Sequence, residues 1–261
     1  QESRGLGDVY KRQTILISWL KMNKYNGIYG IFKGNLGASI SAYTAKAGLK
    51  SIVFISENVD ASKLYQMIAY GSTIHNKEKL KEIKFDEKMY YTTNADPFIM
   101  EGEKTIIYEV LEQNHWKRID YLIAPMGTGC LISALWKGIK EYETLNLIEH
   151  IKTKLIGVQP DRCSPIVDRY HNGKEREEYD EKETIAVDIA FEKPLRSKQA
   201  IKALKESNGD ALKVSDTEML WASRILAKTE GIFAEPAAAS TIATAKKLKE
   251  DGLIDRNDRV I

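Results

Sequence analysis

Apolar runs alternate with amphipathic stretches along most of the chain, and this alternation predicts strands and helices in turn. Short apolar runs predict buried strands at residues 27–32, 51–55, 72–74, 89–92, 121–124, 154–158 and 211–214. Helical spacing of apolar residues predicts helices at residues 14–25, 36–47, 61–70, 77–85, 102–114, 130–142, 201–207, 216–229 and 236–251. Glycines that follow several of these stretches, such as Gly48 and Gly252, are typical of helix ends.

The order of the elements favours an α/β fold. Strands that alternate with helices predict open, mostly parallel sheets with helices on both faces. The turn Asn94-Ala95-Asp96-Pro97 indicates a domain boundary. We therefore expect a smaller α/β domain at residues 14–93 and a larger one at residues 94–261. The mixed charges of residues 170–183 predict an exposed loop.

Both ends of the sequence have the character of fragment edges. Residues 8–13 resemble the translated end of a transposase adapter used to build sequencing libraries, so we expect residues 1–13 to be an adapter-derived scar. At the other end, Arg259-Val260-Ile261 has the pattern of an opening strand, which predicts truncation there as well.

Composition narrows the class of protein. The net charge of +2 gives no case for a nucleic-acid or membrane partner. The two cysteines, Cys130 and Cys163, form no Cys-x-x-Cys pair, and the four histidines are scattered. This usage disfavours disulfides and metal sites and suits a reducing, cytoplasmic compartment. No apolar run is long enough to span a bilayer.

Two predicted strand-to-helix loops could bind a ligand, because parallel sheets bind ligands at the carboxyl ends of their strands. The first runs from Lys33 to Ser39 and contains Gly34-Asn35-Leu36-Gly37. Glycines admit close approach of a ligand to the backbone, the following helix offers N–H groups, and Asn35 can both donate and accept. An ordinary turn is the more common explanation of such a motif.

The second loop is Pro125-Met126-Gly127-Thr128-Gly129-Cys130, which has the form of a phosphate cradle at a helix amino terminus. A dinucleotide fingerprint is disfavoured, because Ile132 stands where that motif needs a glycine and Gln159 ends the next strand without an acidic residue. The sequence also lacks the motifs of P-loop NTPases and α/β-hydrolases.

A third segment joins a probable strand end to a helix. Pro236 suits the first turn of that helix, and Glu235 immediately precedes it. The Glu235 carboxylate could complement the helix dipole or face a ligand in the crevice.

Together these segments resemble the threonine-synthase branch of the fold-type II pyridoxal-phosphate enzymes, in the tryptophan synthase β superfamily. The resemblance extends from Thr14 to Ile261. It rests on the order and spacing of residues 34–39, 42–50, 101–105, 125–129, 155–159, 163–167 and 230–240.

The resemblance implies pyridoxal 5′-phosphate as cofactor and two open, mostly parallel sheets flanked by helices. It implies cofactor contacts for Asn35, Gly127, Thr128, Gly129, Cys130 and Glu235, and substrate contacts for Lys33, Gly34 and Leu36. The lysine that forms the family's Schiff base belongs just upstream of Thr14, so we expect it to be lost. We do not assign this role to Lys11, which lies within the adapter-like stretch.

Some residues depart from the family pattern. Phe32 and Lys33 stand where the family has small hydroxyl residues, and Cys130 stands where the phosphate loop has a glycine. A hydroxyl could donate to a substrate carboxylate or phosphate, whereas Phe32 could not.

The implied activity is that of a lyase that converts O-phospho-L-homoserine and water to L-threonine and phosphate. A homodimer is compatible with this activity, and the fragment itself is not expected to turn over. The alternatives are cysteate synthase, a lyase like threonine dehydratase, and a non-catalytic ligand-binding relative. A nicotinamide-dependent dehydrogenase is a more distant alternative.

Overall fold

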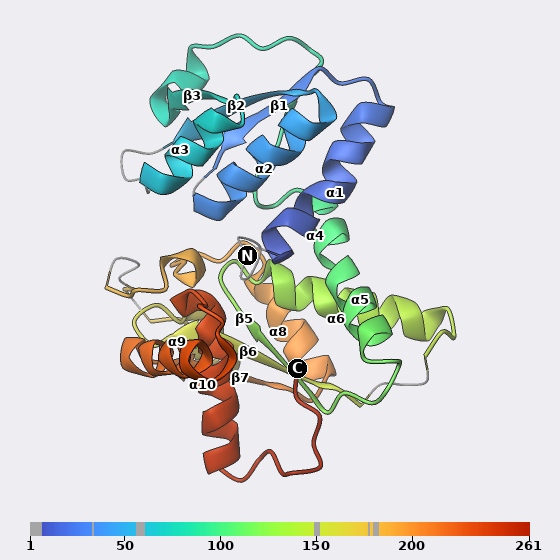
Figure 1. The fold of residues 1–261 in the computed structure, drawn as a ribbon, viewed down its shortest axis with the longest axis vertical. Coiled ribbons are helices and arrows are strands. Elements are labelled where there is room, and N and C mark those ends of the chain that lie inside the picture. The colour runs from blue at the N-terminus through green and yellow to red at the C-terminus, as the bar shows by residue number, and fades with distance from the viewer. Residues whose placement is uncertain (1–6, 33, 56–60, 149–151, 177, 180–182) are drawn as a thin grey trace. The chain divides into compact units, whose positions relative to one another are not determined.

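A computed structural model describes residues 7–32, 34–55, 61–148, 152–176, 178–179 and 183–261 (Figure 1). Contacts divide the chain into two units, of which the amino-terminal one ends at Glu103 and the other continues from Lys104. In both units, the strands of the described residues pair in parallel. The predicted α/β class with parallel sheets flanked by helices is confirmed.

The amino-terminal unit contains a four-stranded sheet in the order β3-β2-β1-β4. Its strands are β1 (Gly27–Ile31), β2 (Lys50–Ile55), β3 (Thr73–Asn76) and β4 (Met89–Tyr91). Its helices are α1 (Gly7–Met22), α2 (Gly34–Ala47), α3 (Ala61–Ala69), the 3₁₀ turn η1 (Lys77–Lys81) and α4 (Pro97–Glu103).

Helix α2 follows β1 and presents the first predicted loop at its amino terminus. It ends before Gly48, whose φ of 68° is a conformation that glycine adopts at little cost. Phe32, directly after β1, is only 1% exposed, so it belongs to the core. Gly37 makes room beside it, because a Cβ at that position would lie 2.8 Å from the sulfur of Met67. The departure at Phe32 therefore has a packing role.

Helix α4 packs closely on α1. A Cβ at Gly102 would collide with the backbone carbonyls of Lys11 and Arg12. The side chain of Arg12 forms an ion pair with Glu103, which is fully buried. Helix α1 begins at Gly7, so it includes residues 8–13 of the adapter-like stretch. These contacts keep α4 in the amino-terminal unit, whereas the turn at residues 94–97 led us to expect the boundary before it.

The second unit is built on the sheet β5-β6-β7. Its strands are β5 (Tyr121–Pro125), β6 (Lys154–Pro160) and β7 (Asp210–Val214). Its helices are α5 (Thr105–Gln113), α6 (Cys130–Thr144), α7 (Pro165–Asn172), the 3₁₀ turn η2 (Val187–Ile189), α8 (Ser197–Glu206), α9 (Asp216–Glu230) and α10 (Pro236–Glu250). Val260 adds a parallel bridge to Tyr121, as the apolar pattern of residues 259–261 predicts.

Helices cover both faces of this sheet because successive residues of β5 and β6 are buried, and successive side chains of a strand point to opposite faces. Leu122 and Leu155 face a core shared with α5, α6, α7 and α8. Ile123 and Ile156 face the opposite side, where they pack with Leu248 of α10. Because helices cover both faces of the sheet, the place where a ligand can bind is at the loops that follow the carboxyl ends of the strands. No helix of the described residues is long and apolar enough to cross a membrane.

Three elements differ from their predictions. Residues 102–114 form two helices, α4 and α5, which separate at Lys104. The helix predicted at residues 77–85 is only the 3₁₀ turn η1, because none of its side chains is buried to hold a longer helix. Helix α7 was not predicted, because its apolar pattern is limited to the short stretch around Ile166 and Val167.

Candidate functional site

The loop between β5 and α6 leads from the carboxyl end of the strand into the amino terminus of the helix. Gly129 caps α6 with φ 83° and ψ 3°, a left-handed conformation that favours glycine. Its carbonyl accepts from Ser133 N (3.3 Å) and Ser133 Oγ (2.6 Å), which fixes the first turn of α6. The half-buried Thr128 accepts a 3.4 Å hydrogen bond from Cys130 N through its hydroxyl. The positive end of a helix of 15 residues thus lies at this loop.

Residues 184–196, which we call the edge strap, form one wall of this loop. A Cβ at Gly127 would lie 3.0 Å from the ring of Phe191 and 3.2 Å from the carbonyl oxygen of Asp188. A Cβ at Gly129 would lie 3.0 Å from the carbonyl oxygen of Arg196. A side chain at either glycine would therefore press against the residues that pack on the loop.

The residues of this loop fit a phosphate group. Glycine at positions 127 and 129 lets the edge strap lie close to the backbone of the loop, and the helix dipole favours an anion. The Cys130 side chain is 2% exposed. A cysteine in place of the expected glycine is therefore accommodated within the protein. The four predicted phosphate contacts, Gly127 to Cys130, are brought together here, and we call residues 127–130 the phosphate cradle.

Glu235 lies in the same unit, directly before Pro236 at the first position of α10. Its side chain makes no capping hydrogen bond to the helix. The neighbouring Ala234 and Ala237 are buried in one apolar cluster with Ile189 of the edge strap. The loop that carries Glu235 therefore packs against the same strap that lines the cradle.

The first predicted loop belongs to the amino-terminal unit. Gly34 begins α2 with a φ of 45°, and Asn35 and Leu36 in its first turn are 8% and 7% exposed. Lys33 lies outside the described residues. The structure thus places Gly34, Asn35 and Leu36 together, in a different unit from the phosphate cradle and Glu235.

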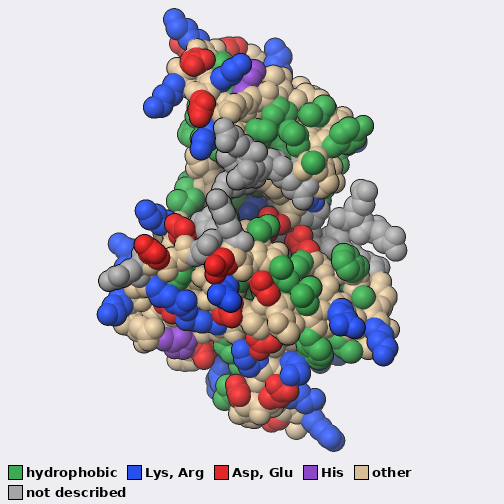
Figure 2. Space-filling view, turned by 90° about the vertical axis from the view of Figure 1, so that its left-hand side faces the viewer, with side chains coloured by type: hydrophobic (Ala, Val, Ile, Leu, Met, Phe, Trp, Pro, Cys, Tyr) green, Lys and Arg blue, Asp and Glu red, His purple; other side chains and the backbone are tan. Residues whose placement is uncertain are grey.

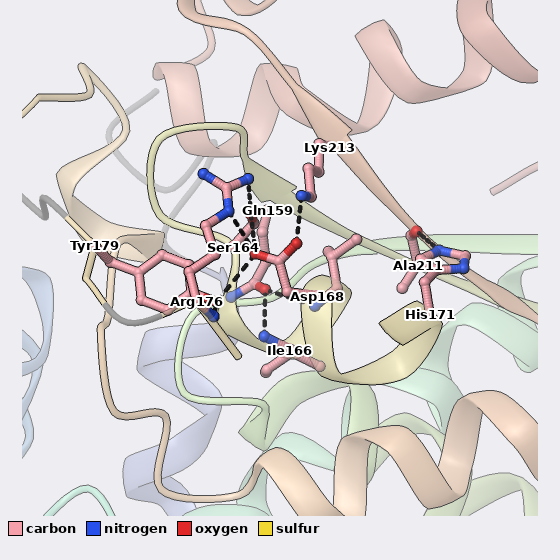
Figure 3. Close-up of polar contacts among 10 residues, drawn as sticks. Gln159, Ser164, Ile166, Asp168, His171, Arg176, Tyr179, Ala211 and Lys213 are labelled. Carbon is pink, nitrogen blue, oxygen red and sulfur yellow. Dashed lines mark hydrogen bonds and ion pairs between the residues drawn. The ribbon is translucent and has the colours of Figure 1, made fainter. Parts of the chain in front are cut away.

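A buried carboxylate near the carboxyl ends of β6 and β7 was missed by the sequence reasoning (Figure 3). Asp168 of α7 is 4% exposed and accepts from Lys213 Nζ (2.5 Å), Tyr179 Oη (3.0 Å) and Ser164 Oγ (3.2 Å). Arg176 Nε lies 3.0 Å from the same carboxylate. We call these five residues the Asp168 hub. Arg176 and Tyr179 come from the segment predicted as an exposed loop, so the hub ties part of that segment to α7.

The hub changes the ionisation of its members. Burial by itself raises the pKa of Asp168, but hydrogen bonds from Lys213 and Tyr179 and the charges of Lys213 and Arg176 outweigh it, so the pKa lies below its ordinary value. Burial, followed by the hydrogen bond to Asp168, raises the pKa of Tyr179 to about 12. The hub is thus an ionised, multiply bonded carboxylate at neutral pH.

Gln159 at the end of β6 caps the helix that carries Asp168. Its Oε1 accepts from Ile166 N (2.9 Å) and Val167 N (3.1 Å), whereas the side chain of Ser164 makes no cap hydrogen bond. A polar residue at the end of an apolar strand, followed by Ser164-Pro165, is the sequence signal that could have predicted α7.

Basic and acidic side chains are interspersed on the face shown in Figure 2. The part of the chain that the structure describes holds no group of three or more side chains arranged to bind a metal ion.

Comparisons with known proteins agree with this geometry. The family model described as pyridoxal-phosphate dependent enzyme matches residues 11–261. A threonine synthase of Methanocaldococcus jannaschii is 38% identical over 238 residues, which cover 87% of this chain and 58% of that protein. A threonine synthase of Bacillus sp. is 34% identical over 237 residues, which cover 87% of this chain and 64% of that protein. The chain thus spans about three fifths of the length of these relatives.

Solved structures share the fold at low sequence identity. A serine racemase from Dictyostelium discoideum superposes with a TM-score of 0.77 at 19% identity, over 100% of this chain and 82% of that one. A fungal L-serine ammonia-lyase from Rhizomucor miehei gives a TM-score of 0.80 at 17% identity, over 98% of this chain and 82% of that one.

Proposed function

Because the chain belongs to the family of pyridoxal-phosphate dependent enzymes, we propose that the protein is a threonine synthase that converts O-phospho-L-homoserine and water to L-threonine and phosphate. The observation that carries the proposal is the phosphate cradle at the amino terminus of α6. Threonine synthases of several organisms match the chain over 87% of its length, at identities up to 38%.

In this proposal the cofactor phosphate is held by residues 127–130, through backbone N–H groups and the Thr128 hydroxyl. Asn35 donates to the ring hydroxyl of the cofactor, and Glu235 lies on the ring side of the site. Lys33, Gly34 and Leu36 belong to the loop that receives the substrate. When bound, the cofactor withdraws electrons from the substrate's α-carbon.

Each of these residues would act by binding or orientation. The α6 dipole and the backbone donors fix the anionic end of the cofactor, which sets the position of its ring. We assign no lysine of this sequence to covalent attachment, and Lys11 is not given that role. We therefore propose that the 261 residues alone do not turn over. A cytoplasmic location, a phosphorylated amino acid as substrate and assembly as a homodimer complete the proposal.

The test uses the gene recovered with its native ends. The purified protein is incubated with pyridoxal phosphate and O-phosphohomoserine, and the amino-acid product and free phosphate are identified. L-threonine with an equal amount of phosphate is the expected result. Parallel incubations with O-phosphoserine plus sulfite and with L-threonine test the cysteate synthase and dehydratase alternatives.

The other outcomes separate the fold from the activity. A bound yellow cofactor without threonine formation would refute threonine synthase and leave an enzyme with another substrate. Absence of cofactor binding would refute the phosphate cradle itself and favour a non-catalytic relative.

A further inference from the structure

The edge strap crosses the carboxyl edge of the sheet in the second unit. One end lies beside Asp216, the first residue of α9, which follows β7. The other end lies beside Thr128, which follows β5. Because β6 stands between β5 and β7, the strap passes from one side of the sheet to the other at the edge where the phosphate cradle lies.

Asp216 fastens the first end with both of its carboxylate oxygens. Thr184 Oγ1 donates to Asp216 Oδ1 (2.7 Å), and Ile185 N donates to Asp216 Oδ2 (3.2 Å). Thr184 is only 4% exposed, and its hydroxyl also accepts from Ala186 N (3.2 Å). We call this arrangement the Asp216–Thr184 clasp. The position of Asp216 is itself fixed, because the neighbouring Ser215 forms a capping box with Glu218 at the start of α9.

The strap continues from the clasp to the cradle through a buried turn. Ile189 N donates to Ala186 O (3.1 Å), and both side chains lie in one apolar cluster with Val158 and Val214 at the ends of β6 and β7. Beyond this turn, Arg196 N donates to Thr128 O (2.9 Å). The strap therefore links the clasp to the cradle over 13 residues that are all described.

The cradle depends on its surroundings more than a site built from side chains would. In the proposed function its donors are backbone N–H groups together with the single hydroxyl of Thr128, so side-chain rotation can do little to compensate for a shift of the loop. Hydrogen bonds weaken steeply with distance and angle, so a displacement of roughly 1 Å costs most of a donor's contribution.

We propose that Asp216 is a positioning residue for the phosphate cradle, which it holds in shape through the strap without touching the cofactor. This inference rests on the proposed function, because it takes residues 127–130 to hold the cofactor phosphate. The clasp holds Thr184 in place at one end of the strap. The buried turn at Ala186 and Ile189 holds the middle of the strap against the sheet edge. The far end of the strap then keeps the backbone of Gly127 and Thr128 in position.

Three substitutions and one control test the clasp. Asp216→Asn keeps the size of the side chain but leaves one acceptor oxygen, so the side chain cannot accept from Thr184 Oγ1 and Ile185 N with separate oxygens. Thr184→Val removes the hydroxyl with little change of shape, and Thr184→Ser restores it. The matched control is Asp255→Asn, because Asp255 Oδ1 also accepts from a backbone N–H, that of Asn257 at 2.7 Å, in the loop after α10.

The first measurement is the affinity of each purified chain for pyridoxal phosphate, inorganic phosphate and pyridoxal, by equilibrium dialysis. We expect Asp216→Asn and Thr184→Val to bind both phosphate-bearing probes about tenfold more weakly, the effect of one lost hydrogen bond. Pyridoxal lacks the phosphate, so its affinity should not change. Thr184→Ser and Asp255→Asn should bind all three probes like the unmodified chain.

The second measurement needs no ligand. Amide hydrogen exchange of peptides that cover residues 126–133 should be faster in Asp216→Asn and Thr184→Val. Faster exchange confined to residues 184–187 would overturn the proposal, and so would unchanged phosphate affinities or equal losses for pyridoxal phosphate and pyridoxal. If the unmodified chain binds neither phosphate-bearing probe, the proposed cofactor site fails and this inference fails with it. If only the proposal about the clasp is wrong, the unmodified chain still binds both phosphate-bearing probes.

Discussion

Substitution of Asp168 by asparagine removes the negative charge at the centre of the hub and keeps the size of the side chain. An asparagine oxygen can still accept from Lys213 Nζ. The other hub donors then face an amide N–H in place of a carboxylate oxygen, so the bonds from Tyr179 and Arg176 are lost. The change therefore tests whether the hub holds the segment after α7 to the rest of the unit.

The loss in free energy of unfolding can be estimated from how exposed Asp168 and its partners are. Hydrogen bonds to charged groups contribute roughly 1.5–3 kcal/mol each, and Asp168 is 4% exposed, so the lost bonds are not replaced by water. The cations are easier to solvate, because the side chains of Lys213 and Arg176 are 32% and 45% exposed. The contribution of these two ion pairs to the free energy of unfolding is therefore reduced, as it is for exposed ion pairs. We expect Asp168→Asn to lower the free energy of unfolding by about 2–3 kcal/mol at pH 7.

The effect should depend on pH with a definite sign. The folded pKa of Asp168 lies below its ordinary value of 3.8, so the carboxylate stabilises the fold above that value. This contribution is lost as the pH falls through the folded pKa, because the proton then binds in both states. The difference between the unmodified chain and Asp168→Asn should therefore be constant above about pH 5 and shrink as the pH falls below 4.

Urea unfolding followed by circular dichroism, at pH 7 and at pH 3.5, measures both effects. Tyr179→Phe is the matched control, because it removes one donor and leaves the charge, and it should cost about 1 kcal/mol. A loss below about 0.5 kcal/mol in Asp168→Asn at pH 7 would refute the hub as a stabilising centre. A difference that does not shrink at pH 3.5 would show that ionisation of Asp168 is not its cause.

Three further changes have expected outcomes. Gln159→Met removes the acceptor that caps α7 and should lower the free energy of unfolding by about 1–2 kcal/mol in urea titrations. Gly129→Ala forces a side chain into a φ of 83° and toward the Arg196 carbonyl, so it should cost about 1–2 kcal/mol and weaken phosphate binding in dialysis. Ser197→Ala removes a buried hydroxyl that makes no hydrogen bond within the described residues, so calorimetry should show an unchanged or higher melting temperature.

Local patterns were sufficient for most of the strands and for the position of the loop at residues 127–130 between β5 and α6. The strands β1, β2, β5, β6 and β7 are short apolar runs whose burial their composition predicts. The cradle combines two glycines with a strand before it and a helix after it, so its position in the fold follows from neighbouring residues alone. The end of α2 at Gly48 follows in the same way, because its φ of 68° favours glycine.

The contacts that were missed join residues far apart in the chain. Lys213 reaches Asp168 across 45 residues, and Asp216 accepts from Thr184 across 32. Neither pairing has a periodic signal, because each depends on which strand ends the sheet places side by side. The ion pair of Glu103 with Arg12, at the end of α4, is likewise a tertiary contact that helix propensity does not contain.

The departure at Cys130 follows from how the cradle is made. In the proposed function the loop binds through backbone N–H groups, so it should tolerate a new side chain wherever that side chain can be buried, and Cys130 is 2% exposed. At Gly127 or Gly129 a Cβ would lie 3.0 Å from an atom of the strap, so a side chain there would require the strap to shift. The identity of the strap and of the residues that fasten it therefore constrains the cradle more than the identity of Cys130 does. For the same reason, the sequence positions most sensitive to change should include Asp216 and Thr184, which do not belong to the cradle.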